Sequence, residues 1–597
     1  MNVIAPVRPS SSVRDQARYM LRRVADCLVR ENYRNLAQGE VIAASEAPFD
    51  DLTITAAHYL IFAAPDGGRL FLPVEPDGFM QAWRVMTPPF VHVAKRGLAL
   101  VDSITEFLDI MGADIEGEER ANLSAFLDEC RAAIEQGVIC EAARAIPAPV
   151  AEKIAHHPEW HEAMLVNDRL ASFLDHPFYP TARAKYGFTV DDLMAYGPEY
   201  QGTFRLNWLA LPQAGLSVQG RVPTVWPSFR DVGLDPVLEH THALLPVHPF
   251  MHGERMDAIL AEAGLSKRAH AAPGEWLEVA PTLSVRALSV IDEPGLHIKL
   301  PLAISTLGRL NLRAIKAATI NDGHVVHALL EDIRSDDPVL KQKLLLTDES
   351  SGGHYDGNRF LGYIVRRYPI ALDAFEPVPV AALMAPMPDG RPYVLHLVQR
   401  YYGGDVHRFI DDFCDLLLDV HLRLAARYGI ELEANQQNSI LLFDREKAGL
   451  RLLLKDNDSP RINGDALRRA YPGSAEWLDR LQDERIASGD GIAQMLITIT
   501  VQLNLGAIVD GIGRHLGQVH GFRQRLRIAV ERSLDRLESE GVAVAPLRAA
   551  LLEATHFPIK YLLRAATLEP RPAMGAADVN KAYGYTAPNF LVGGEDQ

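Results

Sequence analysis

The stretch from residue 279 to residue 315 constrains the fold of this chain most, because it combines two apolar β patterns with many polar side chains. Residues 282–290 and 296–304 are rich in Val, Ile and Leu, and the sequence Asp-Glu-Pro-Gly at 292–295 separates them. This pattern predicts a β-hairpin. The polar residues that interrupt it are Ser284, Arg286, Lys299, Ser305, Thr306, Arg309 and Arg313.

The spacing of these polar residues suggests a receptor for anions. Ser284 and Arg286 are two residues apart, so in a strand both side chains leave the same face. Ser305 and Arg309 are four apart and would share a face of a helix that starts near Ser305, with hydroxyls capping its N-terminus. Arg286, Lys299 and Arg309 would then bind phosphate or carboxylate beside the N–H groups of that helix start. A two-sided sheet with one solvated face would explain the same residues.

Charge and cysteine content limit the class of protein. The 597 residues include 60 Lys and Arg against 77 Asp and Glu, a net charge of −17. This balance argues against nucleic acid or an anionic membrane as the main partner, so an anion site has to be built locally. The four cysteines are scattered without a CxxC spacing. We find no signal peptide and no apolar run of about 18 residues, so we expect a cytoplasmic protein.

Three regions follow from the distribution of helix and strand patterns. Residues 1–150 predict a helix-rich N-terminal domain, which includes a short strand at 52–54 and ends in an Ala/Pro-rich linker at 143–151. Residues 151–400 predict a mostly antiparallel sheet, and residues 401–597 predict a mainly helical region with one hairpin. The overall prediction is an α+β fold without a GxGxxG or Walker A phosphate loop.

Two further segments of the middle region carry specific expectations. The polar residues 348–359 predict a flexible loop that could close over a site. Residues 378–384 and 393–398 predict a second hairpin across the turn Pro-Asp-Gly at 388–390.

The histidines between residues 156 and 185 suggest either a metal site or a substrate-binding site. His157 and His161 have i, i+4 spacing, but Pro158 lies between them and no third ligand is visible, so a metal is weakly indicated. His176 opens the sequence His-Pro-Phe-Tyr-Pro, and Lys185 follows it. This segment predicts a substrate-facing loop or, alternatively, a proline-rich turn with surface charges.

A polar hairpin marks the C-terminal region. The sequence Glu-Ala-Asn-Gln-Gln-Asn at 433–438 precedes a strand, a turn and a return strand that ends at Lys455 and Asp456. The return strand would bring Asp456 beside Glu433, Asn435 and Asn438. Kinase-like sites use a similar hairpin to hold Mg²⁺ on phosphates, and oxygen ligands suit Mg²⁺. A polar hairpin with turn-forming Asn and Asp is the plainer alternative.

In this order, the runs S-V-R-A, K-L, S-T-L-G-R and E-A-N-Q-Q-N followed by K-D resemble the motifs of the IucA/IucC family, the NRPS-independent siderophore synthetases. The resemblance spans roughly residues 168–564, where K-Y-L-L-R at 560–564 resembles another family segment. The chain departs from the family at Asn435, which replaces a His, and at Lys455, which replaces an Arg. Tyr179 also stands where a second His is usual, and Phe250 and Met251 replace a Trp and a Gln.

The resemblance implies a cupped-hand architecture of thumb, fingers and palm, often dimeric. It implies an ATP-dependent ligase that adenylates a carboxylate, most plausibly citrate or a derivative, and condenses it with an amine or hydroxyl. AMP and pyrophosphate would be released, with ATP and Mg²⁺ as cofactors. A kinase-like phosphotransferase and a non-catalytic carboxylate-binding homologue are the alternatives, since two motifs are altered.

The resemblance also implies roles for individual residues. The catalytic residues would be Arg286, Lys299, Arg309 and Asn435. The nucleotide would be bound by Ser284, Arg286, Lys299, Ser305, Thr306, Arg309, Gln437, Asn438, Asp456 and Lys560. The substrates would be bound by His176, Lys185, Thr306, Arg309, Glu433 and Asn435. The Mg²⁺ ligands would be Glu433, Asn438 and Asp456.

Overall fold

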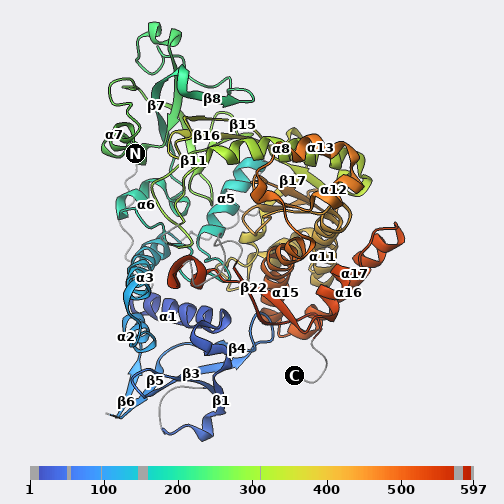
Figure 1. Cartoon of the computed structure of the whole chain (residues 1–597). Coiled ribbons are helices and arrows are strands. Elements are labelled where there is room, and N and C mark those ends of the chain that lie inside the picture. The colour runs from blue at the N-terminus through green and yellow to red at the C-terminus, as the bar shows by residue number, and fades with distance from the viewer. Residues whose placement is uncertain are drawn as a thin grey trace.

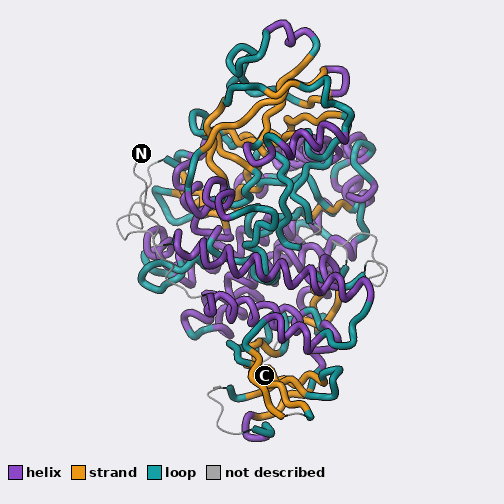
Figure 2. The backbone as a smooth tube through the Cα atoms, turned by 90° about the vertical axis from the view of Figure 1, so that its left-hand side faces the viewer, coloured by secondary structure: helices purple, strands orange, loops and turns teal. Residues whose placement is uncertain are grey.

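The computed structural model describes residues 13–49, 56–95, 97–144, 159–308, 311–570 and 582–592. The predicted strand at 52–54, most of the predicted linker, His157 and Arg309 lie outside the described residues. The described parts form an elongated molecule with strands at both ends and helices between them (Figure 2).

The N-terminal region is a six-stranded antiparallel sheet with helices packed on it (Figure 1). Helix α1 begins the described chain, and its buried face includes Met20, Leu21, Val24 and Leu28, at the helical spacing of an amphipathic segment. Side chains of α1–α3 and of the sheet form one apolar cluster. The elements are α1 (Val13–Arg30), β1 (Glu40–Ala43), β2 (His58–Ala63), β3 (Arg69–Pro76), β4 (Trp83–Val85), β5 (Phe90–Ala94), β6 (Gly97–Val101), α2 (Ile104–Met111) and α3 (Gly117–Ala143).

The middle region is built on a nine-stranded sheet at the opposite end of the molecule (Figure 1). Its strand pairings are antiparallel, which confirms the predicted antiparallel middle region. The strands are β7 (Phe204–Pro212), β8 (Leu216–Gln219), β9 (His242–Val247), β10 (His270–Ala271), β11 (Trp276–Pro281), β12 (Ala287–Val290), β13 (Leu296–Lys299), β15 (Asp348–Tyr355) and β16 (Gly362–Arg367). The helices are α5 (Trp160–Ser172), α6 (Val190–Tyr196), α7 (Glu254–Glu262), α8 (Ala317–Asp336) and α9 (Pro338–Lys343).

The C-terminal region is mainly helical, as predicted, and packs around a four-stranded sheet. That sheet takes two strands from each side of residue 400: β14 (Leu344–Leu346), β17 (Phe375–Pro379), β19 (Ser439–Asp444) and β20 (Leu450–Leu454). The helices are α10 (Tyr393–Tyr402), α11 (Val406–Arg423), α12 (Gly464–Ala470), α13 (Ala475–Leu478), α14 (Gly489–Met495), the π-helix η12 (Leu496–Gly506), α15 (Ala507–Leu516), α16 (Val519–Ser539) and α17 (Ala545–Arg548). Two short sheets pair β18 (Ile430–Glu431) with β21 (Arg461–Ile462), and β22 (His556–Lys560) with β23 (Tyr583–Pro588).

The central hairpin differs from the prediction at its start. Residues 282–286 are the turn between β11 and β12 instead of a strand, so Ser284 and Arg286 do not share a strand face. The turn is closed by the hydroxyl of Thr282, which donates to the carbonyl of Ala287 at 2.7 Å, and Val285 has a φ of +65°. Since only the later part of this apolar run pairs with β13, propensity alone could not locate the turn.

The helix predicted to start near Ser305 is absent. The Ser305 backbone instead bridges Tyr186 and Leu312, and Arg313 pairs with Leu302 and Ile304, so the described residues at the two ends of the loop 302–313 pair with each other. Leu307 and Gly308 have φ values of +55° and +106°, which no right-handed helix contains. The first helix after Ser305 among the described residues is α8, and the Ser305 and Thr306 hydroxyls cap no helix here.

Two other predictions in the middle region were wrong. The polar residues 348–355 are strand β15 of the large sheet. The Tyr363 carbonyl approaches Gly352 closely there, because a Cβ at this position would lie only 2.7 Å from that oxygen. Residues 393–398 belong to helix α10, which follows Pro392 and buries Val394, Leu397 and Val398 at helical spacing. Short apolar runs of this kind fit either a strand or a helix.

One helical run, Gly489–Leu516, is long and apolar enough to cross a membrane by length and composition, which the sequence reading did not find. However, 83% of its most apolar window is buried inside the protein, as expected for the core helix of the C-terminal region.

The end of the described chain returns to its beginning. The carboxylate of Glu31, just after α1, accepts hydrogen bonds from the backbone N–H groups of Leu562, Leu563 and Arg564 at 2.8–3.1 Å. The buried side chains of Leu563 and Leu568 join the N-terminal apolar cluster. The segment that carries Lys560 is therefore fixed to the N-terminal region.

Candidate active site

A buried network of charged side chains lies where the large sheet meets the C-terminal hairpin. Lys299, the last residue of β13, pairs with the carboxylate of Asp456 and lies 3.6 Å from the carboxylate of Asp458. The second oxygen of Asp456 is 2.7 Å from Nη2 of Arg366 on β16. Burial raises the pKa of Asp456, but Arg366 and Lys299 outweigh burial and hold that pKa well below its usual value. Asp456 is therefore ionised at neutral pH.

Glu349 fixes the backbone at Asp456. One oxygen of Glu349 accepts from the N–H of Asp456 at 2.9 Å, from Nε of Arg366 at 2.6 Å and from the hydroxyl of Thr347 at 3.0 Å. Asp456 has a φ of +57°, a left-handed conformation that Asp tolerates better than most residues. Glu349 thus holds both Asp456 and its partner Arg366 in place.

The predicted hairpin at residues 433–456 is confirmed. Strands β19 and β20 pair with Ser439 opposite Leu454, and the N–H of Lys455 donates to the carbonyl of Asn438 at 3.2 Å. The amide of Asn438 donates to the carbonyl of Glu433 at 3.1 Å, so the loop and the return strand are adjacent.

Asn435 shapes the loop before the hairpin. Its side-chain oxygen accepts from the N–H of Gln437 at 3.0 Å and from the N–H of Asn438 at 3.2 Å. The side chain therefore forms an Asx turn, a local hydrogen bond to which Asn is well suited. In the structure Asn435 acts as an acceptor for this turn.

The π-helix η12 supports the same loop from behind. The amide of Gln436 donates to the carbonyl of Leu503 at 2.7 Å, and the amide of Asn504 donates to the carbonyl of Ala434. The hydroxyl of Thr500 donates to the buried carboxylate of Glu431 at 2.9 Å. π-helices often occur at functional sites, and this one contacts the loop through the Asn504 side chain and the Leu503 carbonyl.

Two arginines lie beside this network without a carboxylate partner. Nη1 of Arg286 donates to the carbonyl of Ala314 at 2.6 Å, and its buried Nε has no partner. Burial lowers the pKa of Arg286, whereas Asp456 and Asp458 raise it. The neighbouring Arg313 also has a buried Nε without a partner. Ser284, by contrast, accepts from the N–H of Ala287 at 3.0 Å and stabilises the turn.

The loop at residues 302–313 carries Ser305 and Thr306 and is stabilised by its own contacts. Asn311 donates to the carbonyl of Thr306 at 3.0 Å, and Ser305 exchanges backbone hydrogen bonds with Tyr186. Tyr186 directly follows Lys185. The loop that carries Ser305 therefore contacts the chain just after the segment predicted to face the substrate. The position of Arg309 in this loop is outside the described residues.

His176 and Lys560 lie close to each other, but Lys185 is engaged elsewhere. Nδ1 of His176 accepts from the N–H groups of Phe178 and Tyr179 at 3.2 and 3.1 Å, and burial with nearby Arg and Lys charges lowers its pKa to about 3. Lys560 is among those charges and lies 3.6 Å from Glu433. Lys185 forms a buried ion pair with Glu199 at 2.6 Å.

The residues predicted to bind Mg²⁺ have few oxygen atoms free to coordinate the ion without further ligands. Glu433 and Asp456 are ion-paired, and the described residues contain no group of three His, Cys, Asp or Glu side chains placed to hold a metal. Mg²⁺ usually keeps several waters and takes one or two carboxylates together with substrate phosphates. The carboxylates of Asp456 and Asp458 beside Asn438 fit that mode of binding.

Sequence reasoning missed Glu349 and Arg366, which orient Asp456. Glu349 lies in the segment predicted to be a flexible loop, and Arg366 lies in a segment for which no site residue was predicted. A charged residue directly after the apolar run at residues 363–365 was the signal that could have indicated Arg366, whereas the polar segment around Glu349 gave none. Lys455, which replaces a family Arg, is also buried; burial lowers its pKa, and among the charges that oppose this the strongest is that of Asp168 on α5.

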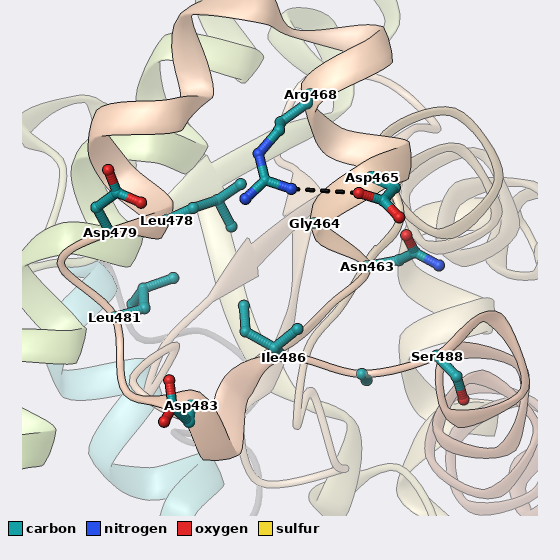
Figure 3. Close-up of a pocket in the computed structure, with 11 residues that line it drawn as sticks. Asn463, Gly464, Asp465, Arg468, Leu478, Asp479, Leu481, Asp483, Ile486 and Ser488 are labelled. Atoms are coloured by element: carbon teal, nitrogen blue, oxygen red, sulfur yellow. Dashed lines mark hydrogen bonds and ion pairs between the residues drawn. The ribbon is translucent and has the colours of Figure 1, made fainter.

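A separate polar cavity of about 630 Å³ lies in the C-terminal region and contains no predicted site residue (Figure 3). In Figure 3 the guanidinium of Arg468 pairs with Asp465, which lies three residues earlier on α12, at 3.3 Å. The lining residues are Asn463, Gly464, Asp465, Arg468, Leu478, Asp479, Leu481, Asp483, Ile486, Ala487 and Ser488.

Comparison with known proteins places this site in a family. Residues 170–385 match the model of the IucA / IucC family, and residues 407–574 match the model described as "Ferric iron reductase FhuF-like transporter". The first match contains Lys299, Glu349 and Arg366, and the second contains Asn435 and Asp456. Residues 170–385 are therefore similar to the IucA/IucC family, as the motifs suggested.

Individual relatives agree with this assignment. Staphyloferrin B synthase of Staphylococcus aureus is 24% identical over 407 residues, which are 64% of this chain and 68% of that protein. The petrobactin biosynthesis protein AsbB of Bacillus anthracis has the same fold, with a TM-score of 0.77, 18% identity and coverage of 97% and 96% of the two chains. ATP-bound aerobactin synthetase IucA of Klebsiella pneumoniae gives a TM-score of 0.69 at 16% identity, covering 98% and 100%. Matches to the first curated relatives span 51–68% of their lengths.

Proposed function

We propose that this protein is an ATP-dependent ligase that joins a carboxylate to an amine or hydroxyl, with citrate or a citrate derivative as the acid. The observation that carries the proposal is the arrangement of Lys299, Arg286 and Arg313 beside the hairpin that ends in Asp456. The relatives support it, since several are named as citrate ligases or siderophore synthases. The ATP-bound relative supports the nucleotide.

In the first step, a carboxylate oxygen of the acid attacks the α-phosphate of ATP. A bond forms between this oxygen and phosphorus, the bond to the β-phosphate breaks, and an acyl-adenylate and pyrophosphate result. Lys299 and Arg286 stabilise the negative charge that develops on the phosphates. Without nucleotide, Lys299 neutralises Asp456, so a triphosphate has to compete with Asp456 for this cation. Mg²⁺ held by Asp456 and the phosphates would add positive charge at the same place.

In the second step, the amine or hydroxyl attacks the acyl carbon and AMP leaves. The adenylate is already activated, so positioning of the nucleophile accounts for most of this step. Glu433, about two-fifths exposed and 3.6 Å from Lys560, is placed to bind a cationic amine at the edge of the site. The turn formed by Asn435 sets the position of Glu433 relative to the hairpin.

Analysis of reaction products tests the proposal against its two alternatives. The protein is incubated with ATP, Mg²⁺, citrate and hydroxylamine, and the nucleotides and the hydroxamate are quantified, with a reaction lacking citrate as control. We expect AMP, pyrophosphate and a hydroxamate that all depend on citrate. ADP alone would support the phosphotransferase, and nucleotide binding without turnover would support a binding homologue. The homodimer and the cytoplasmic location stay predictions.

A further inference from the structure

Arg313 lies at the base of the loop that carries Thr306. Its backbone pairs with the other end of the loop: the N–H of Arg313 donates to the carbonyl of Ile304 at 2.9 Å, and its carbonyl accepts from the N–H of Leu302 at 3.0 Å. The next residue, Ala314, accepts the hydrogen bond from Arg286. The two guanidinium groups are therefore held near each other by backbone structure.

Arg313 is half-buried, its buried Nε has no partner, and the described residues give its guanidinium no hydrogen bond or ion pair. Arg366 contacts Glu349 at 2.6 Å, Arg183 contacts Asp175 at 3.0 Å, and Arg423 contacts Asp337 at 3.2 Å. The one nearby carboxylate that attracts Arg313 is Asp456, which Lys299 and Arg366 already contact.

An unpaired buried charge is unfavourable, and a second cation beside it increases the cost. Burial, and next the charge of Arg286, lower the pKa of Arg313 to about 9, while Asp456 raises it. A site that keeps two such groups together is complete only when an anion binds between them.

We propose that Arg313 is an anion-binding residue of this site and contacts, together with Arg286, the phosphate chain of the nucleotide. This inference rests on the proposed function, because it takes ATP as the ligand. The polyphosphate is favoured over the acid substrate because the charges of Asp456 and Arg286 act on Arg313, and Asp456 pairs with Lys299, the cation that the proposed function assigns to the phosphates.

The test compares wild type with Arg313→Gln and Arg313→Lys, and with Arg334→Gln as a control. Arg334 lies on the surface of α8 and pairs with Glu331. Binding of ATP with Mg²⁺, of pyrophosphate and of citrate is measured by calorimetry, and thermal unfolding is recorded without ligand. We expect Arg313→Gln to weaken ATP and pyrophosphate binding by about tenfold or more, because charge-assisted hydrogen bonds to phosphate are lost. Arg313→Lys should bind with intermediate affinity, and citrate binding should not change.

Thermal unfolding separates ligand binding from a structural role. Removal of an unpaired buried charge should leave the unliganded Arg313→Gln protein at least as stable as wild type. A lower unfolding temperature, or unchanged ATP and pyrophosphate binding, would overturn the inference. Weakened citrate binding alone would also overturn it, in favour of a carboxylate. If wild type binds ATP but forms ADP, the ligase proposal fails while Arg313 remains tested; if wild type does not bind ATP, both fail.

Discussion

Asn435 offers the sharpest test of the site, because the chain departs from its family at this position and the structure gives the residue a defined task. Its side-chain oxygen accepts hydrogen bonds from the N–H groups of Gln437 and Asn438. In Asn435→Ala both donors lose this partner, and water can replace it only in part at a half-buried site. A lost hydrogen bond of this kind costs about 1–3 kcal/mol when the partner is buried, so we expect the free energy of unfolding to fall by about 1–2 kcal/mol.

The effect on activity should be similar in size to the effect on stability. If the Asx turn positions Glu433 and Asn438, its loss should lower kcat/KM for pyrophosphate release by about tenfold, which corresponds to about 1.4 kcal/mol. Asn435→Asp keeps the acceptor oxygen, so it should retain stability but weaken ATP binding by placing another negative charge near Asp456. Asn358→Ala is a matched control, since the Asn358 side chain accepts from the N–H of Phe360 in a similar turn outside the hairpin at residues 433–456.

The assay is the pH profile of pyrophosphate release, combined with urea denaturation of each variant. Asn435→His should retain nucleotide binding and add a titration step between about pH 6 and 7, because the imidazole titrates there and the amide does not. Asn435→Ala with wild-type stability and wild-type rates at every pH would refute the reasoning. A wild type that is nearly inert and gains activity by orders of magnitude in Asn435→His would show instead that the position requires a protonatable group.

Three further predictions follow from the charges. Arg286→Lys should lower turnover by about tenfold or more without unfolding the protein, because Lys cannot reproduce a two-point contact with phosphate. Steady-state kinetics measure the turnover, and circular dichroism checks that the variant is folded. We predict the same effect for Arg309→Lys. Glu349→Gln should lower the free energy of unfolding by about 1–3 kcal/mol, since it removes one of the two carboxylates that pair with the buried Arg366; a loss below 1 kcal/mol by denaturation would contradict the network. The pKa of His176 is lowered to about 3, so the unfolded state binds the extra proton between about pH 3 and 6.5 and stability rises with pH in that window. His176→Gln should reduce this slope by at most about 1.4 kcal/mol per pH unit, and an unchanged slope in pH-dependent denaturation would exclude a neutral buried His176.

The fold class and the C-terminal hairpin could be predicted from the sequence because their signals are local. A polar loop, two short apolar runs and a turn fix the pairing of Ser439 with Leu454 almost without regard to the rest of the chain. The same reasoning placed the start of the central hairpin wrongly, since residues 282–286 form a turn and not a strand. The preceding strand, β11, carries Trp276 and Glu278 and shows no clean alternation of apolar and polar residues.

The network behind Asp456 could not be predicted because its members are far apart in the sequence. Glu349 and Asp456 are 107 residues apart, and Lys299 and Asp456 are 157 apart. Their proximity depends on the order of strands β13, β16 and β15 and on the packing of the C-terminal sheet against them. Motif resemblance indicated Lys299 and Asp456 separately, whereas the contact between them and the supporting role of Arg366 required the three-dimensional arrangement.

The contact between Glu31 and residues 562–564 has a consequence for synthesis on the ribosome. Glu31 leaves the ribosome at least 531 residues before its hydrogen-bond partners. At about 5–20 residues per second, this carboxylate waits roughly half a minute to two minutes for them. During that time the N-terminal region cannot bury Glu31 without cost, because its backbone partners do not yet exist. The N-terminal region therefore reaches its final packing only after residues 562–564 have left the ribosome, and a chain stopped before residue 562 would expose an apolar surface to chaperones.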